Sequence, residues 1–144
     1  MHWKYKGKII KTVEDFPKDT LGFIYRITNH SKNNKFYVGR KTAVSFTKKA
    51  LTIKEKNLAE NKRKKFKKIL KESNWKKYWG SSKELLEDIE NGDNCTREIL
   101  RFCFSKAELS YYEAKEILCS DCLLNEENYN YWMSWRVYAK NLKK

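Results

Sequence analysis

Two short segments with alternating side chains, separated by a run of turn-forming residues, constrain the fold of this chain more than any other feature. Within residues 22–28, every second side chain from Phe23 onward is aromatic or apolar, which is the period of a β-strand. The next six residues, Asn29 to Asn34, favour a turn. Residues 36–39 then predict a second strand, so the two segments together predict an antiparallel hairpin.

Two capped helices are predicted further along the chain. Ser82 is a suitable N-cap for a helix over residues 83–90, and Asn91-Gly92 is suited to end it. Ser105-Lys106-Ala107-Glu108 fits a capping box, which predicts a second helix running to about Cys119.

The order of these elements predicts the fold class. Residues 96–104 predict a third strand, and residues 7–10 predict a short strand or an arm. We therefore expect an α+β fold with a small three-stranded antiparallel sheet flanked by helices. The length predicts one domain over residues 1–144, with a basic helical insertion at about 43–78 and an aromatic, basic tail at about 131–144.

The net charge of +14 points to a polyanionic partner, of which nucleic acid is the first candidate. Residues 47–78 hold thirteen Lys or Arg and three Glu, without Gly or Pro, and predict mostly helix with a basic face. The alternative is a solvated charge run that is partly disordered. Candidate nucleic-acid-binding residues are Lys48, Lys49, Lys62, Arg63, Lys64, Lys65, Lys68, Lys76 and Lys77.

The composition also predicts the compartment. No stretch approaches the ~18–20 apolar residues of a membrane span, and residues 1–10 lack the apolar core of a signal peptide. We expect a cytoplasmic protein without a membrane partner, in a host cytoplasm if the chain is phage-encoded. Cys95, Cys103, Cys119 and Cys122 are then expected to be reduced packing residues, with a structural zinc site as the alternative.

An ordered series of motifs resembles the GIY-YIG nuclease superfamily, in its phage-type, homing-endonuclease-like branch. The hairpin holds Gly22-Phe23-Ile24-Tyr25 and then Tyr37-Val38-Gly39, like the paired strands that name the superfamily. The resemblance extends over roughly residues 5–131. The downstream matches are Trp75-Lys76-Lys77-Tyr78-Trp79-Gly80-Ser81-Ser82, Arg97-Glu98-Ile99-Leu100, Ser105-Lys106, Leu109-Ser110-Tyr111-Tyr112-Glu113-Ala114 and Tyr129-Asn130.

The resemblance implies a role for four positions. Tyr25 would activate the attacking water or itself approach the phosphorus, and Tyr37 would support Tyr25 or contact the phosphate. Glu113 would bind one divalent metal ion, Mg²⁺ or Mn²⁺, and Asn130 would support the site. The implied activity is metal-dependent hydrolysis of phosphodiester bonds in DNA.

Helix geometry singles out Glu113 independently of the resemblance. At ~100° per residue, Leu109, Glu113 and Ile117 share one face of the helix that begins at Lys106. A carboxylate placed between two apolar residues is half-buried, which costs stability unless a cation pairs with it. That partner is either a metal ion or a basic side chain in a structural ion pair.

The cations around Tyr25 depart from the family's commonest pattern. A strand tyrosine is usually a core residue, and a phenol with a pKa near 10 needs a nearby cation to act as a base. The family arginine after the second motif has no counterpart in residues 42–50. Arg40, Lys41 or Arg63 would replace it, and Tyr78 would stand in for a histidine found in some members.

Two functions from different classes are compatible with these features. The first is an endonuclease acting on DNA, expected to be double-stranded. The second is a catalytically inactive basic protein that binds nucleic acid through the basic segment and the tail aromatics. Tyr25 together with Glu113 discriminates between them, because a pure binding protein needs neither.

Overall fold

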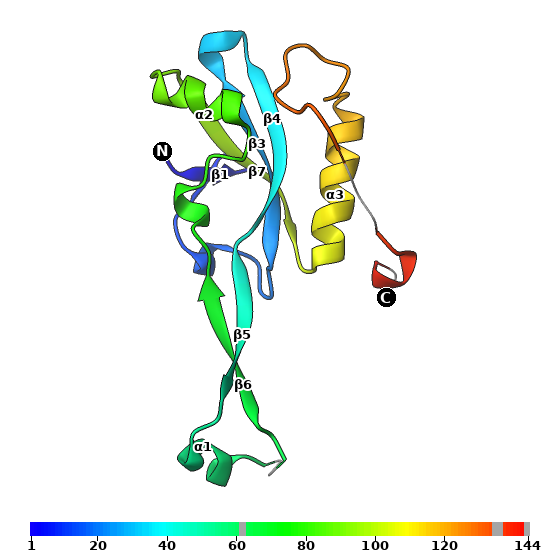
Figure 1. Ribbon diagram of the computed structural model, residues 1–144. Coiled ribbons are helices and arrows are strands. Elements are labelled where there is room, and N and C mark those ends of the chain that lie inside the picture. Colours follow the sequence, from blue (N-terminus) through cyan, green and yellow to red (C-terminus); the bar gives the residue numbers. More distant parts are fainter. Residues whose placement is uncertain (61–62, 134–136, 143–144) are drawn as a thin grey trace.

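The computed structural model describes residues 1–60, 63–133 and 137–142. It is an α+β structure whose body carries one long projection (Figure 1). The strands are β1 (Trp3–Tyr5), β2 (Lys8–Ile10), β3 (Gly22–Asn29), β4 (Lys35–Thr42), β5 (Val44–Ala50), β6 (Phe66–Glu72) and β7 (Cys95–Cys103). The helices are α1 (Ile53–Leu58), α2 (Lys83–Glu90) and α3 (Lys106–Cys119), and 3₁₀ turns are η1 (Val13–Asp15), η2 (His30–Lys32), η3 (Trp75–Lys77) and η4 (Ala139–Asn141).

The main sheet has five strands in the order β2-β1-β7-β3-β4, so the prediction of three antiparallel strands was incomplete. Its centre, β7-β3-β4, is antiparallel as predicted. Strand β1 pairs parallel to β7, and β2 pairs antiparallel to β1. The reason is tertiary, because Trp3 is buried and its ring packs edge-on against Phe23 and Tyr25. A three-residue strand is too short to show its own periodicity.

The tyrosine hairpin is confirmed. Strands β3 and β4 pair from Gly22↔Thr42 to Asn29↔Lys35, which places Tyr25 opposite Gly39. The predicted turn residues form η2, whose N-cap Asn29 accepts a hydrogen bond from the backbone N–H of Ser31. Both predicted helices and their serine N-caps are also confirmed, in α2 and α3.

The basic insertion is a β-hairpin and not the helix that its sequence predicted. Strands β5 and β6 pair antiparallel from Val44↔Glu72 to Ala50↔Phe66, and only α1 at the tip is helical. The backbone of β4 passes through Ala43 directly into β5, so the sheet direction continues into the insertion. That continuation overrides the weak helix preference of a lysine-rich segment without Gly or Pro. We call residues 44–72 the arm (Figure 1).

Two apolar layers cover the main sheet. One face packs aromatic residues, including Trp3, Phe23, Tyr25 and Trp75. The opposite face packs Ile24 and Val38 against Leu109 and Ile117 of α3. Strand β4 forms one edge of the sheet, so residues from both layers can meet around it. Within the described ranges, no helix has the length and apolar character needed to cross a membrane.

Candidate active site

A cavity of about 710 Å³ lies around the exposed edge of β4. Six of the seven predicted catalytic residues line it, although they come from five separate segments of the chain. They are Tyr25, Tyr37, Arg40, Tyr78, Glu113 and Asn130. The lining also includes residues 81–84 and Glu87 at and within α2, Ile117 of α3, and residues 129 and 131–133 of the C-terminal segment.

Strand alternation explains how one edge strand serves both sides of the cavity. Successive side chains of a strand point to opposite faces. Tyr37 of β4 therefore lies with Tyr25 and Tyr78 on the aromatic side, whereas Arg40 lies on the side of α3 with Glu113. The cavity thus joins a cluster of phenols to an ion pair across the edge of the sheet.

Three tyrosines form the aromatic side of the site. The ring of Tyr25 is 6.1 Å from that of Tyr37 and 5.9 Å from that of Tyr78 between centroids. Burial raises the pKa of Tyr25 well above its usual value, and the neighbouring Tyr37, Tyr78 and Glu113 add to this shift. Burial also raises the pKa of Tyr37, whose hydroxyl shares a hydrogen bond of 2.9 Å with Ser81 Oγ. The Tyr25 phenol is therefore protonated at neutral pH in this environment.

Two glycines allow the tyrosines to approach the backbone. A Cβ at Gly39 would lie 2.4 Å from the Tyr25 hydroxyl oxygen and 2.7 Å from its Cζ. Gly80 has a φ of +89°, and a Cβ there would lie 3.2 Å from Cε1 of Tyr37. The glycine of Tyr37-Val38-Gly39 thus provides the space that the phenol of Tyr25 occupies.

The Gly39→Ala variant is expected to be less stable than wild type by about 1–3 kcal/mol, because its methyl group overlaps the phenol of Tyr25. Chemical denaturation measures this loss. Tyr25→Phe removes the nearest atom but leaves Cζ, so the double variant should recover part of the stability lost by Gly39→Ala. Strictly additive losses in this double-mutant cycle would contradict the contact.

Glu113 lies between buried Leu109 and Ile117 on α3, as the helix geometry predicted. Its Oε2 is 3.2 Å from Nε of Arg40, and its side chain is 18% exposed. Arg40 also donates a hydrogen bond from Nη1 to Ser110 Oγ, one turn earlier on α3. The basic partner expected for a half-buried carboxylate is therefore Arg40, and the pair faces the cavity.

Three carboxylates line the cavity and could hold a divalent ion: Glu113 of α3, and Glu84 and Glu87 of α2. Mg²⁺ binds through one or two carboxylates and otherwise retains waters and substrate oxygens, and Glu113 supplies one such carboxylate. Across residues 1–60, 63–133 and 137–142, no three His, Cys, Asp or Glu are grouped closely enough to hold a metal ion. The four cysteines are free thiols in the structure.

Lys41 points away from Glu113, to the aromatic side of β4. Its Nζ donates a hydrogen bond of 2.7 Å to Asn74 Oδ1 and lies 4.2 Å from the centroid of the Tyr78 ring. Partial burial lowers its pKa. Of the three replacements considered for the family arginine, Arg40 is the one that contacts Glu113, and Lys41 instead supports Tyr78. Arg63 lies beyond the far end of the arm's strands.

Asn130 binds the edge of β4 as a further strand would. Its Oδ1 accepts from the backbone N–H of Val38 at 3.0 Å, and its Nδ2 donates to the Val38 carbonyl at 2.8 Å. The preceding residue continues this pairing, because Tyr129 N donates to the Phe36 carbonyl at 2.9 Å. Asn130 therefore positions the segment that lines the cavity.

Arg97 belongs to a matched motif but received no predicted role. Its guanidinium lies between the rings of Trp3 and Trp79, at 4.7 and 4.3 Å from their centroids. It donates to the backbone carbonyls of Lys76, at 3.1 Å, and Tyr78, at 2.9 Å. Burial lowers its pKa to about 10, so it stays charged at neutral pH. Arg97 thus fixes the loop that carries Tyr78, and only its position in a strand of alternating apolar residues hinted at burial.

A polar network that the sequence did not indicate anchors the other end of the cavity. Buried Asp88 of α2 accepts a hydrogen bond of 2.6 Å from the hydroxyl of Tyr129 and pairs with Lys32 at 2.5 Å. Asn29 donates to the Tyr129 hydroxyl at 3.0 Å. Burial opposes the ionised form of Asp88, but the hydrogen bonds from Lys32 and Tyr129 outweigh it, so its pKa is lowered.

The predicted nucleic-acid-binding residues fall into two groups. Lys48, Lys49, Arg63, Lys64 and Lys65 are exposed on the arm. Lys68 lies in strand β6, and Lys62 lies outside the described residues. Lys76 and Lys77 are exposed in η3, where Lys76 pairs with Glu72 at 3.0 Å. Most of these cations therefore belong to a β-ribbon and its tip, and not to the predicted helix.

Comparison with known protein families gives one match that spans most of the chain. Residues 3–136 match the family described as "Putative endonuclease segE, GIY-YIG domain". Searches of curated proteins and of solved structures found no match. The matched residues include both tyrosine motifs and every residue that lines the cavity. The chain therefore belongs to the segE-type GIY-YIG endonuclease domain family.

Proposed function

We propose that this protein is a divalent-metal-dependent endonuclease that hydrolyses phosphodiester bonds in DNA, with residues 1–144 acting as one nuclease domain. The cavity at the edge of β4 carries this proposal, because it joins Tyr25 and Tyr37 to Arg40 and Glu113. Cleaving a phosphodiester requires a positioned nucleophile and positive charge on the phosphate oxygens. Tyr25 and Tyr37 can position an attacking water, and Arg40 supplies positive charge for the phosphate.

Each of these side chains has a distinct proposed role. Glu113 holds the ion, Mg²⁺ or Mn²⁺, which when bound supplies positive charge to the phosphate and helps to generate the nucleophile. The guanidinium of Arg40 binds non-bridging phosphate oxygens, for which its planar donor geometry is suited. Tyr37, held by Ser81, contacts the phosphate, and Tyr78 packs against Tyr25.

Tyr25 is proposed to act at the attacking water. Its raised pKa keeps the phenol protonated before DNA and a divalent ion bind. Positive charge brought into the cavity favours the phenolate, because an opposite charge within a few ångströms lowers the pKa of an acid. Tyr25 can then accept a proton from the water as the water oxygen bonds to phosphorus. The bond from phosphorus to the leaving sugar oxygen breaks, and solvent water protonates that oxygen.

The alternative is a binding protein without catalysis. The net charge and the exposed lysines would serve such a protein equally well. A binding surface does not require a buried phenol that faces a half-buried carboxylate in a cavity, so we favour the nuclease. The free thiols are consistent with our proposal of a reducing cytoplasm as the site of action.

Cleavage should depend completely on a divalent ion. Incubation with supercoiled and linear DNA should give products with Mg²⁺ or Mn²⁺ and none with EDTA, and restoring excess Mg²⁺ should restore cleavage. Gel electrophoresis of the products measures this. Binding without cleavage of any DNA or RNA across several metal ions would instead support the binding-only alternative.

A further inference from the structure

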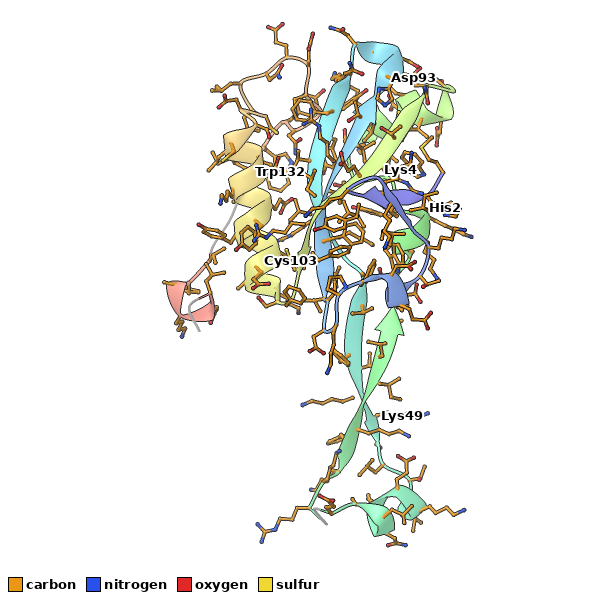
Figure 2. All side chains as sticks on the ribbon, turned by 180° about the vertical axis from the view of Figure 1, so that it is seen from behind. His2, Lys4, Lys49, Asp93, Cys103 and Trp132 are labelled. Atoms are coloured by element: carbon orange, nitrogen blue, oxygen red, sulfur yellow. The ribbon has the colours of Figure 1, made fainter. Side chains whose placement is uncertain are left out.

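The arm concentrates positive charge away from the cavity. Residues 44–72 contain eleven Lys or Arg and three Glu, so a segment of 29 residues carries a net charge of +8 out of +14. Figure 2 shows Lys49 on this projection, whereas Trp132, which lines the cavity, lies on the body. The arm is therefore a second cationic region that the catalytic site does not explain.

The arm places like charges opposite one another on its own strands. Lys49 and Lys67 are direct cross-strand partners, an arrangement in which like charges are destabilising. Glu55 pairs with Lys67 at 2.8 Å, and Glu72 pairs with Lys76 outside the arm. Lys48, Lys49 and Lys71 are exposed. An isolated two-stranded ribbon is already marginally stable, so a polyanion along it would stabilise the arm.

One face of the arm carries exposed apolar residues on either side of the cross-strand pair Lys48↔Lys68. Phe46 and Leu70 are cross-strand partners that are 61% and 54% exposed, and Phe66 on the same face is 53% exposed. Lys49, Lys67 and Lys71 alternate onto the other face. The major groove of B-DNA admits a two-stranded ribbon, where apolar side chains contact thymine methyl groups and lysines reach the phosphates at the rims.

The root of the arm is fixed to the strand that carries the site. Ser73 donates from its N–H to the Ala43 carbonyl at 2.8 Å and from Oγ to the Thr42 carbonyl at 2.7 Å. Ala43 and Val44 are buried and both donate backbone hydrogen bonds to the Leu21 carbonyl. The arm is therefore attached rigidly to β4 at its base, and its position relative to Arg40 is set by the backbone.

We propose that the arm lies in the major groove of duplex DNA, with the far end of its strands up to about one helical turn from the phosphate bound in the cavity. Ten residues separate Arg40 from Ala50, which span at most ~33 Å in extended conformation. One turn of B-DNA is ~34 Å. The position of the cut relative to the arm rests on the proposed nuclease function, whereas the groove contact does not.

The test is DNA binding as a function of duplex length, measured by fluorescence anisotropy with wild-type protein in EDTA. Affinity for duplexes of about 8 to 26 base pairs should rise at least about tenfold between about 10 and 18 base pairs, where one duplex begins to reach both regions. This rise exceeds the proportional increase that comes from a larger number of binding positions. The deep, narrow major groove of A-form RNA excludes the ribbon, so RNA duplexes should show no such rise.

Matched lysine variants isolate the contribution of the arm. The triple variant Lys48→Gln/Lys49→Gln/Lys71→Gln should lose the length-dependent rise, and its salt slope should be shallower by up to about 2.7. The control Lys4→Gln/Lys8→Gln/Lys18→Gln removes the same charge from exposed positions on the body and should keep the rise. Removing like-charge repulsion should leave the melting temperature of the arm variant no lower than that of wild type.

Three outcomes would overturn this inference. The first is an unchanged length dependence in the arm variant, and the second is an equal rise in affinity with duplex RNA. The third is a dimer of the wild-type protein that the Phe46→Ser substitution dissociates, because the exposed apolar residues would then form a contact between two copies of this chain. Length-dependent binding by a protein that cleaves nothing would refute the nuclease but support the groove contact. Cleavage without length-dependent binding would support the nuclease but refute the groove contact.

Discussion

The Glu113→Gln variant is expected to lose DNA cleavage by at least about a thousandfold while keeping its fold and its affinity for DNA. Glutamine has nearly the same shape as glutamate but lacks the charge that holds a divalent ion. Arg40, which pairs with Glu113 at 3.2 Å, remains available for phosphate. Single-turnover cleavage rates, thermal melting and anisotropy binding measure the three quantities separately.

Glu116→Gln is the matched control, because Glu116 lies on the same helix and hydrogen-bonds Ser120 instead of Arg40. It should cleave DNA at a rate close to that of wild type. A purely structural ion pair predicts the opposite pattern for Glu113→Gln, with a lower melting temperature and a nearly normal cleavage rate. That pattern would remove Glu113 from the proposed site.

The Tyr25→Phe variant is expected to cleave DNA about 10² to 10⁴ times more slowly, the usual contribution of a group that transfers a proton. Only the hydroxyl is removed, so the ring keeps its edge-on contact with Trp3 at 5.3 Å. The measurement is the single-turnover rate at saturating protein, with melting temperature as a check on the fold.

Tyr5→Phe provides the control for Tyr25→Phe. Tyr5 also packs edge-on against an aromatic ring, that of Phe102, but lies on β1 away from the cavity. Its variant should retain wild-type cleavage. A Tyr25→Phe protein that cleaves within a few-fold of wild type would show that the phenol of Tyr25 takes no part in the chemistry.

The parts of the fold that the sequence predicted are those encoded by local patterns. Alternation identified β3 and β4, and serine caps identified α2 and α3, because these signals lie within the elements themselves. Strand β1 has three residues and owes its place to Trp3, whose burial depends on residues distant in the chain. A contact between residues so distant in the chain leaves no local pattern in the sequence.

The arm shows how tertiary context overrides local preference. Its lysines and its lack of Gly and Pro favour a helix. A single residue, Ala43, separates the end of β4 from the start of β5, so β5 follows the strand direction already established. Phe46 and Phe66 are exposed on the resulting ribbon. The basic character of the segment was predicted correctly, but its geometry was not.

The sequence named residues that the structure gathers around one cavity, but it did not indicate how they pair with one another. Helix spacing placed Glu113 between Leu109 and Ile117, and the structure agrees. The choice between Arg40 and Lys41 depends on which face of β4 meets α3, and this is decided only when the helix packs on the sheet. The positioning role of Arg97 likewise requires the rings of Trp3 and Trp79, which are 76 positions apart in the sequence.

The central claim is that one cavity brings a phosphate, Tyr25, Arg40 and a divalent ion on Glu113 together. Anomalous scattering from Mn²⁺ in crystals of the Tyr25→Phe variant bound to duplex DNA tests this claim most directly. We predict a peak at about 2.1 Å from the Glu113 carboxylate, the distance typical of a small divalent ion and an oxygen ligand, with a DNA phosphate beside it in the cavity. Duplex DNA bound elsewhere on the protein, with no anomalous peak at Glu113, would contradict the account.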